Sequence, residues 1–492
     1  MRTLLIYPKF PDTFWSFKYA LSFIHKKAAF PPLGLLTVAS LLPNDFQKRV
    51  VDTNVNSLTD DDLSWAELVF IGGMAVQRES AKKIIARCKS MNLKIIAGGP
   101  LFTAEPEEFN EVDHLVLDEA EITLPLFLED LKTGHLKKIY RASGYCDIQD
   151  TPIPSWDLID IKKYASMSVQ FSRGCPFNCE FCNVTALFGH RSRIKTPEQI
   201  ITELDNIYSA GWRGPIFFVD DNFIGNKKFL KARLLPALID WRKDKKGCAF
   251  FTEASIDLAD DPELLDMIVR AGFDSVFIGI ESPDDACLTE CHKNQNRNRD
   301  LLQSVKIIQR AGLQVMGGFI VGFDSDTPSI FQRQIDFIQR SGIVAAMVGL
   351  LQAPPGTRLF DRLKKENRVA EKFSGDNVDG TTNILPRMGF ESLLEGYRSI
   401  MKNIYSPPNF YRRVRNLLNE VKPNNFTLSV DRQKILALIH SSLRLGIWGK
   451  ERFHYWRLFF WTLLRRPRLL SLAVTLAIYG HHYRKICKIY II

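Results

Sequence analysis

Residues 173–182 read RGCPFNCEFC and place three cysteines, Cys175, Cys179 and Cys182, on one short segment. Three residues separate the first pair and two separate the second. The segment follows an apolar stretch with the pattern of a strand and precedes a predicted helix. Three thiolates on one tight loop can bind three irons of a cubane iron–sulfur cluster and leave the fourth iron without a protein ligand. We therefore predict a [4Fe-4S] cluster with one open coordination position, where chemistry can occur.

Zinc and buried structural cysteines are the alternatives to a cluster. Structural zinc takes a fourth ligand, and the nearest histidine, His190, lies at no familiar zinc spacing. The nine cysteines of the chain are scattered and odd in number, which fits free thiols in a reducing compartment. The N-terminal ten residues show no charged segment leading into a long apolar run, so no secretory signal is visible. We expect a cytoplasmic protein.

Strands and helices alternate around the cysteine segment. The predicted strands are 166–172, 215–221, 248–255, 275–282, 315–323 and 345–351. A predicted helix follows each of the first five. Six such units over residues 165–370 predict a parallel sheet curved into a complete or partial (β/α)6 barrel, in which function gathers at the carboxyl ends of the strands. The cysteine segment follows the first strand and so lies at that end.

The first 142 residues predict a separate α/β domain. Its apolar runs, read as buried parallel strands, are 4–8, 50–55, 68–73, 94–99 and 114–117. Five strands with crossover helices make a doubly wound, Rossmann-like (flavodoxin-like) sheet, which binds ligands at the carboxyl ends of its strands. Four glycines lie at two of these ends, namely Gly72, Gly73, Gly98 and Gly99. They permit close approach of the backbone to a ligand, although structural turns would need the same glycines.

A polar linker at 143–164 joins the two domains, and helical patterns dominate residues 371–492. Charge is unevenly distributed along the chain. From residue 401 onward there are 17 Lys or Arg and 3 Asp or Glu, whereas the first 400 residues contain 48 and 52. The basic C-terminal region therefore favours an acidic partner, such as a phospholipid surface, nucleic acid or another protein.

RGCPFNCEFC resembles the signature of the radical S-adenosylmethionine (radical SAM) superfamily, and the domain before it resembles the cobalamin-binding branch. Supporting segments are FPPLGLL (30–36), FVDDNF (218–223), FIGIES (277–282), GGFIVGFDSDT (317–327) and APPGTRL (353–359). The resemblance covers about residues 1–370, and the helical remainder is typical of a subfamily whose C-terminal region has no assigned function. It implies that S-adenosylmethionine chelates the open iron and is cleaved reductively, with an electron donor such as ferredoxin or flavodoxin. The 5′-deoxyadenosyl radical then abstracts hydrogen from an unreactive carbon.

The resemblance also implies roles for residues of the barrel. Phe181 would pack on adenine, and Asp220 and Asp221 would contact the methionyl part. Hydrogen bonds to the ribose or carboxylate would come from Glu253, Ser255, Glu281 and Ser282, and close backbone approach to the nucleoside from Gly318 and Gly322. Buried carboxylates are costly without a partner, which favours ligand-facing roles. Helix caps, salt bridges with Arg173 or Lys293, and a β-bulge are the structural alternatives.

Two departures bear on cobalamin, which remains a predicted cofactor. Domains that bind it through histidine carry Asp-x-His-x-x-Gly, whereas residues 52–57 here read DTNVNS. No protein imidazole can therefore coordinate cobalt at that place. The acidic turn usually written Gly-Glu-Gly-Glu is DEAE at 118–121. A second metal site at Cys287, Cys291 and His292 is not expected, because it would have only two thiols.

The segment 452–485 mixes aromatic and basic residues around an apolar run, 469–478. That run is far shorter than the ~20 residues of a spanning helix. The aromatic residues Trp456, Phe459, Phe460 and Trp461 lie near Arg457, Arg465, Arg466 and Arg468. They suit a helix lying on anionic lipid, with peripheral membrane contact and a hydrophobic, isoprenoid- or hopanoid-like substrate. A core helix packed on the barrel is the alternative, and the one we prefer.

We thus expect a cobalamin-dependent radical SAM methyltransferase that acts on an unactivated carbon of a small molecule or lipid. A radical SAM cyclase, coupling or rearrangement enzyme without methyl transfer is the second hypothesis. Methylthio transfer to tRNA would need three N-terminal cysteines, but only Cys88 and Cys146 precede residue 175. A non-enzymatic cluster protein that binds nucleic acid through the basic tail is the hypothesis from another class; nucleic acid is not the partner we expect.

Overall fold

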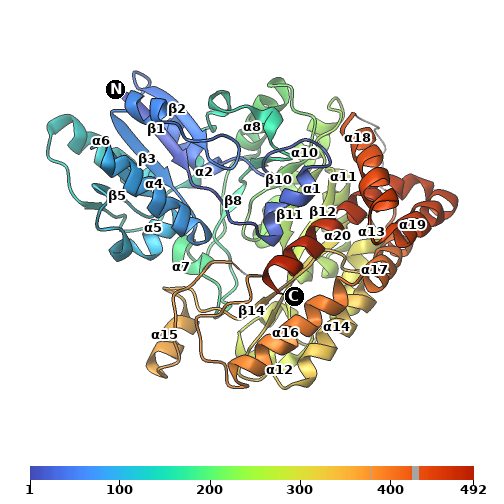
Figure 1. The fold of residues 1–492 in the computed structure, drawn as a ribbon. Helices are drawn as coiled ribbons and strands as arrows, with labels where there is room; N and C mark the ends of the chain where they lie inside the picture. Colours follow the sequence, from blue (N-terminus) through green and yellow to red (C-terminus); the bar gives the residue numbers. More distant parts are fainter. Residues whose placement is uncertain (377, 424–431, 492) are drawn as a thin grey trace.

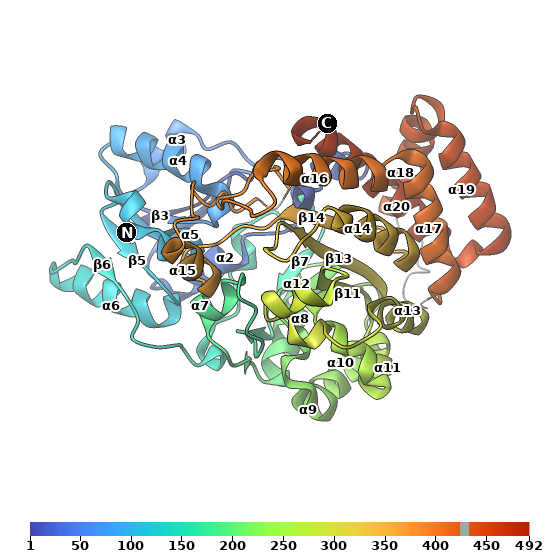
Figure 2. The same ribbon diagram turned by 90° about the horizontal axis from the view of Figure 1, so that it is seen from below.

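The computed structural model describes residues 1–376, 378–423 and 432–491. Two six-stranded parallel sheets organise the chain (Figure 1). The first has the order β2-β1-β3-β4-β5-β6, and the second has the order β14-β13-β12-β11-β10-β7. The C-terminal helices of residues 407–465 lie on the side of the second sheet that faces away from the first, whereas the last helix, residues 470–490, runs back to the centre of the molecule (Figure 1 and Figure 2).

The first sheet is doubly wound, as predicted. Its strands are β1 (Arg2–Tyr7), β2 (Gln47–Asp52), β3 (Leu68–Gly72), β4 (Lys94–Gly98), β5 (His114–Val116) and β6 (Ile139–Tyr140). Successive residues alternate between two cores: Leu4 and Ile6 face α3 (Asp60–Trp65), α4 (Arg78–Ser90) and α5 (Pro100–Ala104), whereas Leu5 faces α2 (Leu33–Leu41) and α6 (Ala120–Thr133). Burial on both faces explains the continuous apolar runs. The two-residue strand β6 was not predicted, because it is too short to show a period.

The second sheet is an open, partial barrel whose strands follow one another in chain order. They are β7 (Met167–Val169), β10 (Ile216–Phe218), β11 (Phe250–Ala254), β12 (Phe273–Glu281), β13 (Gln314–Val321) and β14 (Ala346–Leu350). Helices after the strands include α8 (Pro197–Ser209), α10 (Leu235–Arg242), α11 (Pro262–Arg270), α13 (Leu301–Ala311) and α14 (Ser329–Ser341). α8 begins with a capping box between Thr196 and Gln199.

The strand predicted at 166–172 is shorter than expected and ends at Val169. The next residues form β8 (Ser172–Arg173), which pairs antiparallel with β9 (Arg193–Ile194). This two-stranded ribbon carries a loop, residues 174–192, that contains the three cysteines and the short helix α7 (Val184–Phe188). The cysteines therefore lie at the carboxyl end of β7 on an excursion from the sheet.

The C-terminal region continues the barrel core. Its helices are α15 (Arg358–Lys365), α16 (Phe390–Ile404), α17 (Pro407–Glu420), α18 (Arg432–Ser441), α19 (Arg452–Arg465) and α20 (Leu470–Tyr490). One hydrophobic cluster joins α16, α17, α18, α19 and α20 to the barrel, whereas α15 packs in a separate cluster. α20 packs beside α1 (Lys18–Leu21) near the centre of Figure 1. Positions 377, 424–431 and 492 of the region predicted over 371–492 lie outside the described residues.

The apolar run 469–478 lies at the start of α20 and is largely buried. The preferred interpretation of residues 452–485 as a core helix is therefore confirmed for this run. α19 differs, because it buries Tyr455, Leu458 and Thr462 but leaves Phe460 exposed. Within the described residues, no helix combines the length and the apolar character that a bilayer span requires.

Candidate active site

Two aspartates after β10 hold the beginning of the cysteine loop. The Asp220 carboxylate accepts hydrogen bonds from the backbone N–H groups of Phe171 (3.3 Å) and Ser172. Asp221 accepts from the N–H of Gly174 (2.9 Å). Gly174 has φ +92°, and a Cβ there would lie 2.5 Å from the carbonyl oxygen of Arg191. Only glycine fits this turn. The two predicted methionyl-contacting residues thus already have a structural task.

The far side of the loop is held by residues distant in the sequence. The N–H of Glu180 donates to the carbonyl of Cys291 (3.0 Å), and the N–H of Leu359 donates to the carbonyl of Glu180 (3.1 Å). The Glu180 carboxylate pairs with Arg362 of α15 (2.8 Å). α15 therefore clamps the cysteine loop from outside the barrel.

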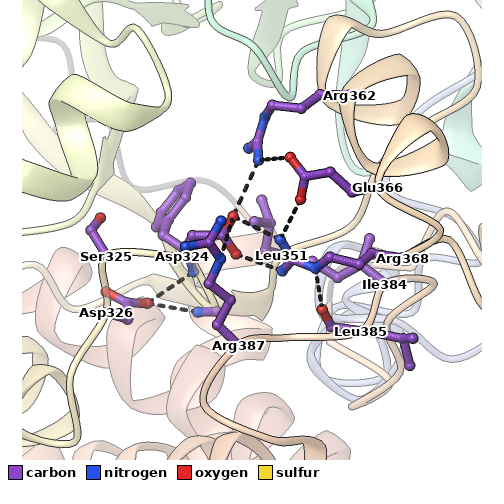
Figure 3. A network of polar contacts seen from close by, with 12 residues as sticks. Asp324, Ser325, Asp326, Leu351, Arg362, Glu366, Arg368, Ile384, Leu385 and Arg387 are labelled. Carbon is purple, nitrogen blue, oxygen red and sulfur yellow. Dashed lines mark hydrogen bonds and ion pairs between the residues drawn. The ribbon is translucent and has the colours of Figure 1, made fainter.

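Arg362 belongs to a network around Asp324, which follows β13 (Figure 3). Asp324 lies 3.1 Å from Arg362, 2.5 Å from Arg368 and 3.4 Å from Arg387. Burial would raise the pKa of Asp324, but the hydrogen bonds and charge of Arg368, together with Arg362, hold that pKa below its ordinary value. Sequence reasoning missed this network, because no local spacing connects its members.

The donor set of the loop fits an iron–sulfur cluster. Burial raises the pKa of the Cys175 thiol, and it raises the pKa of Cys182 to about 12; the charge of Cys179 raises both further. Cluster ligands bind as thiolates, so binding would release protons from the loop. Within the described ranges, no three His, Cys, Asp or Glu side chains are placed to hold a single metal ion.

A cavity of about 380 Å³ adjoins the cysteines and is lined by Phe181, Cys182, Glu281 and Gly318, among others. Glu281 pairs with Lys293 at 2.7 Å, which is one of the salt bridges considered from the sequence. A Cβ on Gly318 would lie 2.8 Å from the ring of Phe277. The missing side chain keeps the cavity open, and a charged pair beside an aromatic ring suits an amino-acid–nucleoside ligand.

Of the other predicted barrel residues, Ser255, Ser282 and Gly322 have local hydrogen-bond partners, whereas Glu253 has carboxylates as neighbours. Burial, with the charges of Asp221 and Asp220, raises the pKa of Glu253 to about 8. Ser255 bonds to Asn222 (N–H to Oδ1, 3.2 Å), and the Ser282 hydroxyl accepts from the N–H of Asp284 (3.3 Å). The N–H of Gly322 donates to Asp326 (2.7 Å). Ligand contacts by these residues remain predictions.

The second metal site considered at Cys287 and Cys291 is instead part of an apolar cluster. Both cysteines are buried and pack with Phe323 and Leu359 near Phe181. The thiol of Cys287 donates to Asp326 (2.9 Å). Cys287 and Cys291 thus belong to the apolar cluster against which Phe181 packs.

A larger cavity, of about 860 Å³, lies at the carboxyl ends of β1, β3 and β4, between the first sheet and the barrel. All four predicted glycines line it, namely Gly72, Gly73, Gly98 and Gly99. Gly98 is also required by packing, since a Cβ would lie 2.4 Å from the carbonyl oxygen of Val116. The barrel contributes Gln170, Phe217 and Val219. A floor of bare backbone in a cavity of this size fits a large, flat cofactor such as a corrin.

Asn54 lines this cavity where histidine-binding cobalamin domains carry the imidazole. Its side-chain amide donates to Asp52 (2.7 Å), and its side-chain oxygen accepts from the N–H of Phe10 (2.8 Å). Asp52 also accepts from the hydroxyl of Tyr164 (2.9 Å). Asn54 therefore fixes the loop after β1, and a corrin would bind here without a ligand from this position.

The acidic turn, residues 118–121, pairs with the ribbon that carries the cysteine loop. Glu119 lies 2.7 Å from Arg173 and 2.9 Å from Arg193, and Glu121 lies 3.0 Å from Arg173. Burial would raise the pKa of Glu121, but the charge and hydrogen bonds of Arg173 keep it below its ordinary value. Arg173 thus pairs with the acidic turn, and not with a barrel carboxylate as the sequence alternative proposed. The turn anchors the strand that leads to Cys175.

Two family models match the chain. Residues 169–338 match the radical SAM superfamily, and residues 357–491 match a domain of unknown function, DUF4070. An uncharacterized methyltransferase of Synechocystis sp. is 41% identical over 501 residues, covering 99% of this chain and 93% of that protein. The hopanoid C-2 methylase of Rhodopseudomonas palustris is 33% identical over 479 residues, covering 94% and 90%.

Solved structures share the fold. The cobalamin-dependent S-adenosylmethionine radical enzyme OxsB, with aqua-cobalamin bound, has a TM-score of 0.63 at 16% identity over 99% of this chain and 84% of that chain. The radical S-adenosylmethionine methyltransferase TsrM of Kitasatospora setae, with cobalamin and a [4Fe-4S] cluster bound, has a TM-score of 0.63 at 14% identity over 92% and 97%. The predicted fold class is confirmed.

Proposed function

The chain belongs to the radical SAM methyltransferases, and from that premise we propose that it is a cobalamin-dependent enzyme that methylates an unactivated carbon of a lipid-class substrate. The observation that carries the proposal is the junction of the two cavities. Met74, Val76, Pro100 and Gly375 line both of them. A methyl donor beside the cysteines and a corrin on the glycine floor would therefore face one shared space.

Each part of the site has a task in this proposal. Cys175, Cys179 and Cys182 would hold the cluster, and Phe181 with the Glu281–Lys293 pair would orient S-adenosylmethionine. When bound, the cluster supplies the electron for cleavage, and cobalamin supplies a metal that can accept and pass on a methyl group. An external donor such as a ferredoxin or flavodoxin would first reduce the cluster. The protein's own contribution is to position these groups and to exclude water.

Aromatic side chains in the walls of the two cavities favour an apolar substrate. The Trp15 ring packs edge-on against Phe277 (centroids 5.3 Å apart), and its N–H donates to the sulfur of Met347 (2.9 Å). Phe217 stacks on Phe251 with centroids 4.8 Å apart. These rings offer almost no hydrogen-bonding groups to a polar ligand. The identity with the hopanoid C-2 methylase supports a polycyclic isoprenoid lipid as the substrate class.

Anaerobic reconstitution tests the proposal. Purified protein supplied with iron, sulfide and hydroxocobalamin should show cluster and corrin absorbance, and after reduction should convert S-adenosylmethionine to 5′-deoxyadenosine. Cys179→Ala should abolish the cluster and the cleavage, whereas Cys88→Ala, on α4 of the first domain, should keep both. Gly73→Leu should fill the larger cavity and remove corrin binding without loss of the cluster. A Cβ at Gly73 meets its nearest neighbour, Leu101, at 3.7 Å, so the backbone tolerates the change.

Other outcomes would select the competing hypotheses. Cleavage of S-adenosylmethionine without corrin binding would indicate a radical reaction without methyl transfer. Absence of cleavage, with salt-sensitive binding to nucleic acid, would indicate the non-enzymatic alternative. Gly144→Leu, at an open position, is the matched control for the glycine variant.

A further inference from the structure

α18, α19 and the helical turn between them, Ser442–Ile447, present an apolar face to solvent. Of nineteen exposed large apolar side chains in the described part of the chain, ten lie between residues 435 and 464. They are Ile435, Leu436, Ile439, Leu443, Ile447, Trp448, Phe453, Phe460, Leu463 and Leu464. Single exposed apolar residues are ordinary, but such a concentration marks an interaction site. We call these ten residues the apolar face.

The apolar face follows helical spacing. Ile435, Ile439, Leu443 and Ile447 recur every four residues, so they share one side of the helix. On α19, Phe453, Phe460 and Leu464 recur at seven and four residues.

Trp456 connects these two rows. Its indole N–H donates to the carbonyl of Gly446 (3.0 Å), and its ring stacks on Phe460 with centroids 5.6 Å apart. The two rows therefore form one surface.

Packing of the fold does not account for this surface. α19 already buries Tyr455, Leu458 and Thr462 on its inner side. The side chains on the outer side are exposed to solvent: Trp448 is 73% exposed, Phe453 is 75% exposed and Leu464 is 82% exposed. α19 therefore has one apolar side buried in the fold and a second apolar side exposed to solvent. The exposed side indicates a surface that binds a partner outside this fold.

The charge around the apolar face has one sign. Between residues 443 and 468 the exposed charged side chains are Arg444, Lys450, Arg452, Arg457, Arg465 and Arg468. The acidic residue of this stretch, Glu451, is buried and pairs with Arg484. A basic rim around aromatic and aliphatic side chains complements an anionic surface with an apolar interior, which is the chemistry of a phospholipid monolayer.

We propose that the apolar face docks on a bilayer that contains anionic phospholipid. The helices lie in the plane of the interface, with Trp448, Phe453 and Leu464 among the acyl chains and the basic rim at the headgroups. This inference rests on the exposed surface and is independent of methyl transfer. It gives a protein without a spanning helix in its described residues direct access to lipid.

Cosedimentation of the full-length protein with vesicles tests the docking. Vesicles of phosphatidylcholine with phosphatidylglycerol should bind the protein, and vesicles of phosphatidylcholine alone should bind it weakly. Binding should weaken as salt increases. The combined variant Trp448→Ser, Phe453→Ser, Leu464→Ser should bind about tenfold more weakly or worse. Arg452→Gln, Arg457→Gln and Arg465→Gln should each cost about fivefold.

The combined variant Leu126→Ser, Ile307→Ser, which removes exposed apolar side chains elsewhere, is the control and should bind like the wild type. All variants should keep their melting temperature and S-adenosylmethionine cleavage, which separates this test from that of the proposed function. Equal binding by the triple-serine variant, or no binding by the wild type, would overturn the proposal. A dimer by ultracentrifugation that the triple-serine variant abolishes, without vesicle binding, would assign the face to a second copy of the chain instead.

Discussion

At the scale of single residues, Arg362 holds the cysteine loop in place from outside the barrel. Arg362 contacts the Glu180 carboxylate through Nε (2.8 Å) and reaches Asp324 through a second nitrogen (3.1 Å). Glu180 lies between Cys179 and Cys182, and Asp324 lies after β13. The planar guanidinium can hold both carboxylates at fixed angles, which an ammonium group cannot do.

Arg362→Ala should therefore loosen the cysteine loop. We expect a loss of about 1–2 kcal/mol in unfolding free energy, because the pair is partly exposed. Iron retained per protein after gel filtration should also fall, and Arg362→Lys should be intermediate. Arg368→Ala is the matched control, because Arg368 binds Asp324 but not Glu180. Full iron retention by Arg362→Ala would show that α15 does not hold the cluster loop.

At the scale of elements, α20 supports the loop that follows β1. The Phe14 ring stacks on Tyr483 with centroids 4.0 Å apart, and the imidazole of His482 donates to the carbonyl of Phe14 (3.0 Å). Burial lowers the pKa of His482 to about 4, so the ring is neutral. Residues 9–13 of the supported loop line the larger cavity. A C-terminal helix thus forms the support of an N-terminal ligand wall.

Tyr483→Ala should cost about 3–5 kcal/mol, because it leaves a cavity beneath Phe14. It should also weaken corrin binding, measured by absorbance titration of the folded variant. Tyr483→Phe should be neutral or stabilising, since the buried Tyr483 hydroxyl makes no hydrogen bond to any described residue. If Tyr483→Ala bound the corrin with wild-type affinity, α20 would have no influence on corrin binding in the larger cavity.

At the scale of the whole molecule, residues 372–376 join the C-terminal region to the first domain. Lys372 pairs with Glu108 (2.7 Å), and Arg78 donates to the carbonyl of Phe373 (2.8 Å). Gly375 lies against the loop after β3, where a Cβ would come 2.7 Å from the nitrogen of Val76. This segment, residues 372–376, lies at the junction of the two cavities, because Gly375 lines both of them.

Gly375→Ala should therefore disturb the junction. Its φ of +75° and the contact with Val76 both disfavour a side chain. We expect methyl transfer to fall much more than S-adenosylmethionine cleavage, measured by product analysis in one reaction. Gly380→Ala has the same backbone strain (φ +76°) but meets its neighbours at 3.8 Å or more. It should therefore cost only about 1 kcal/mol in stability. Equal losses in the two variants would attribute the effect to strain alone.

The sequence predicted those features that depend on local pattern. Cysteine spacing located the loop, continuous apolar runs located the buried strands, and glycines at strand ends marked the larger cavity. The Glu180–Arg362 pair could not be predicted from the sequence, because its two residues lie 182 positions apart. The packing of the aromatic and basic segment 452–485 could not be predicted from the sequence either. α19 and α20 both contain apolar, aromatic and basic residues. Only tertiary packing decides that α20 is enclosed while α19 leaves one apolar side exposed to solvent.

The contact between Phe14 and Tyr483 has a consequence for biosynthesis. A ribosome completes the first sheet long before it reaches α20. Until α20 has been made, the loop after β1 lacks its support, and the wall of the larger cavity is incomplete. We therefore expect stable corrin binding to require that α20 has folded against this loop.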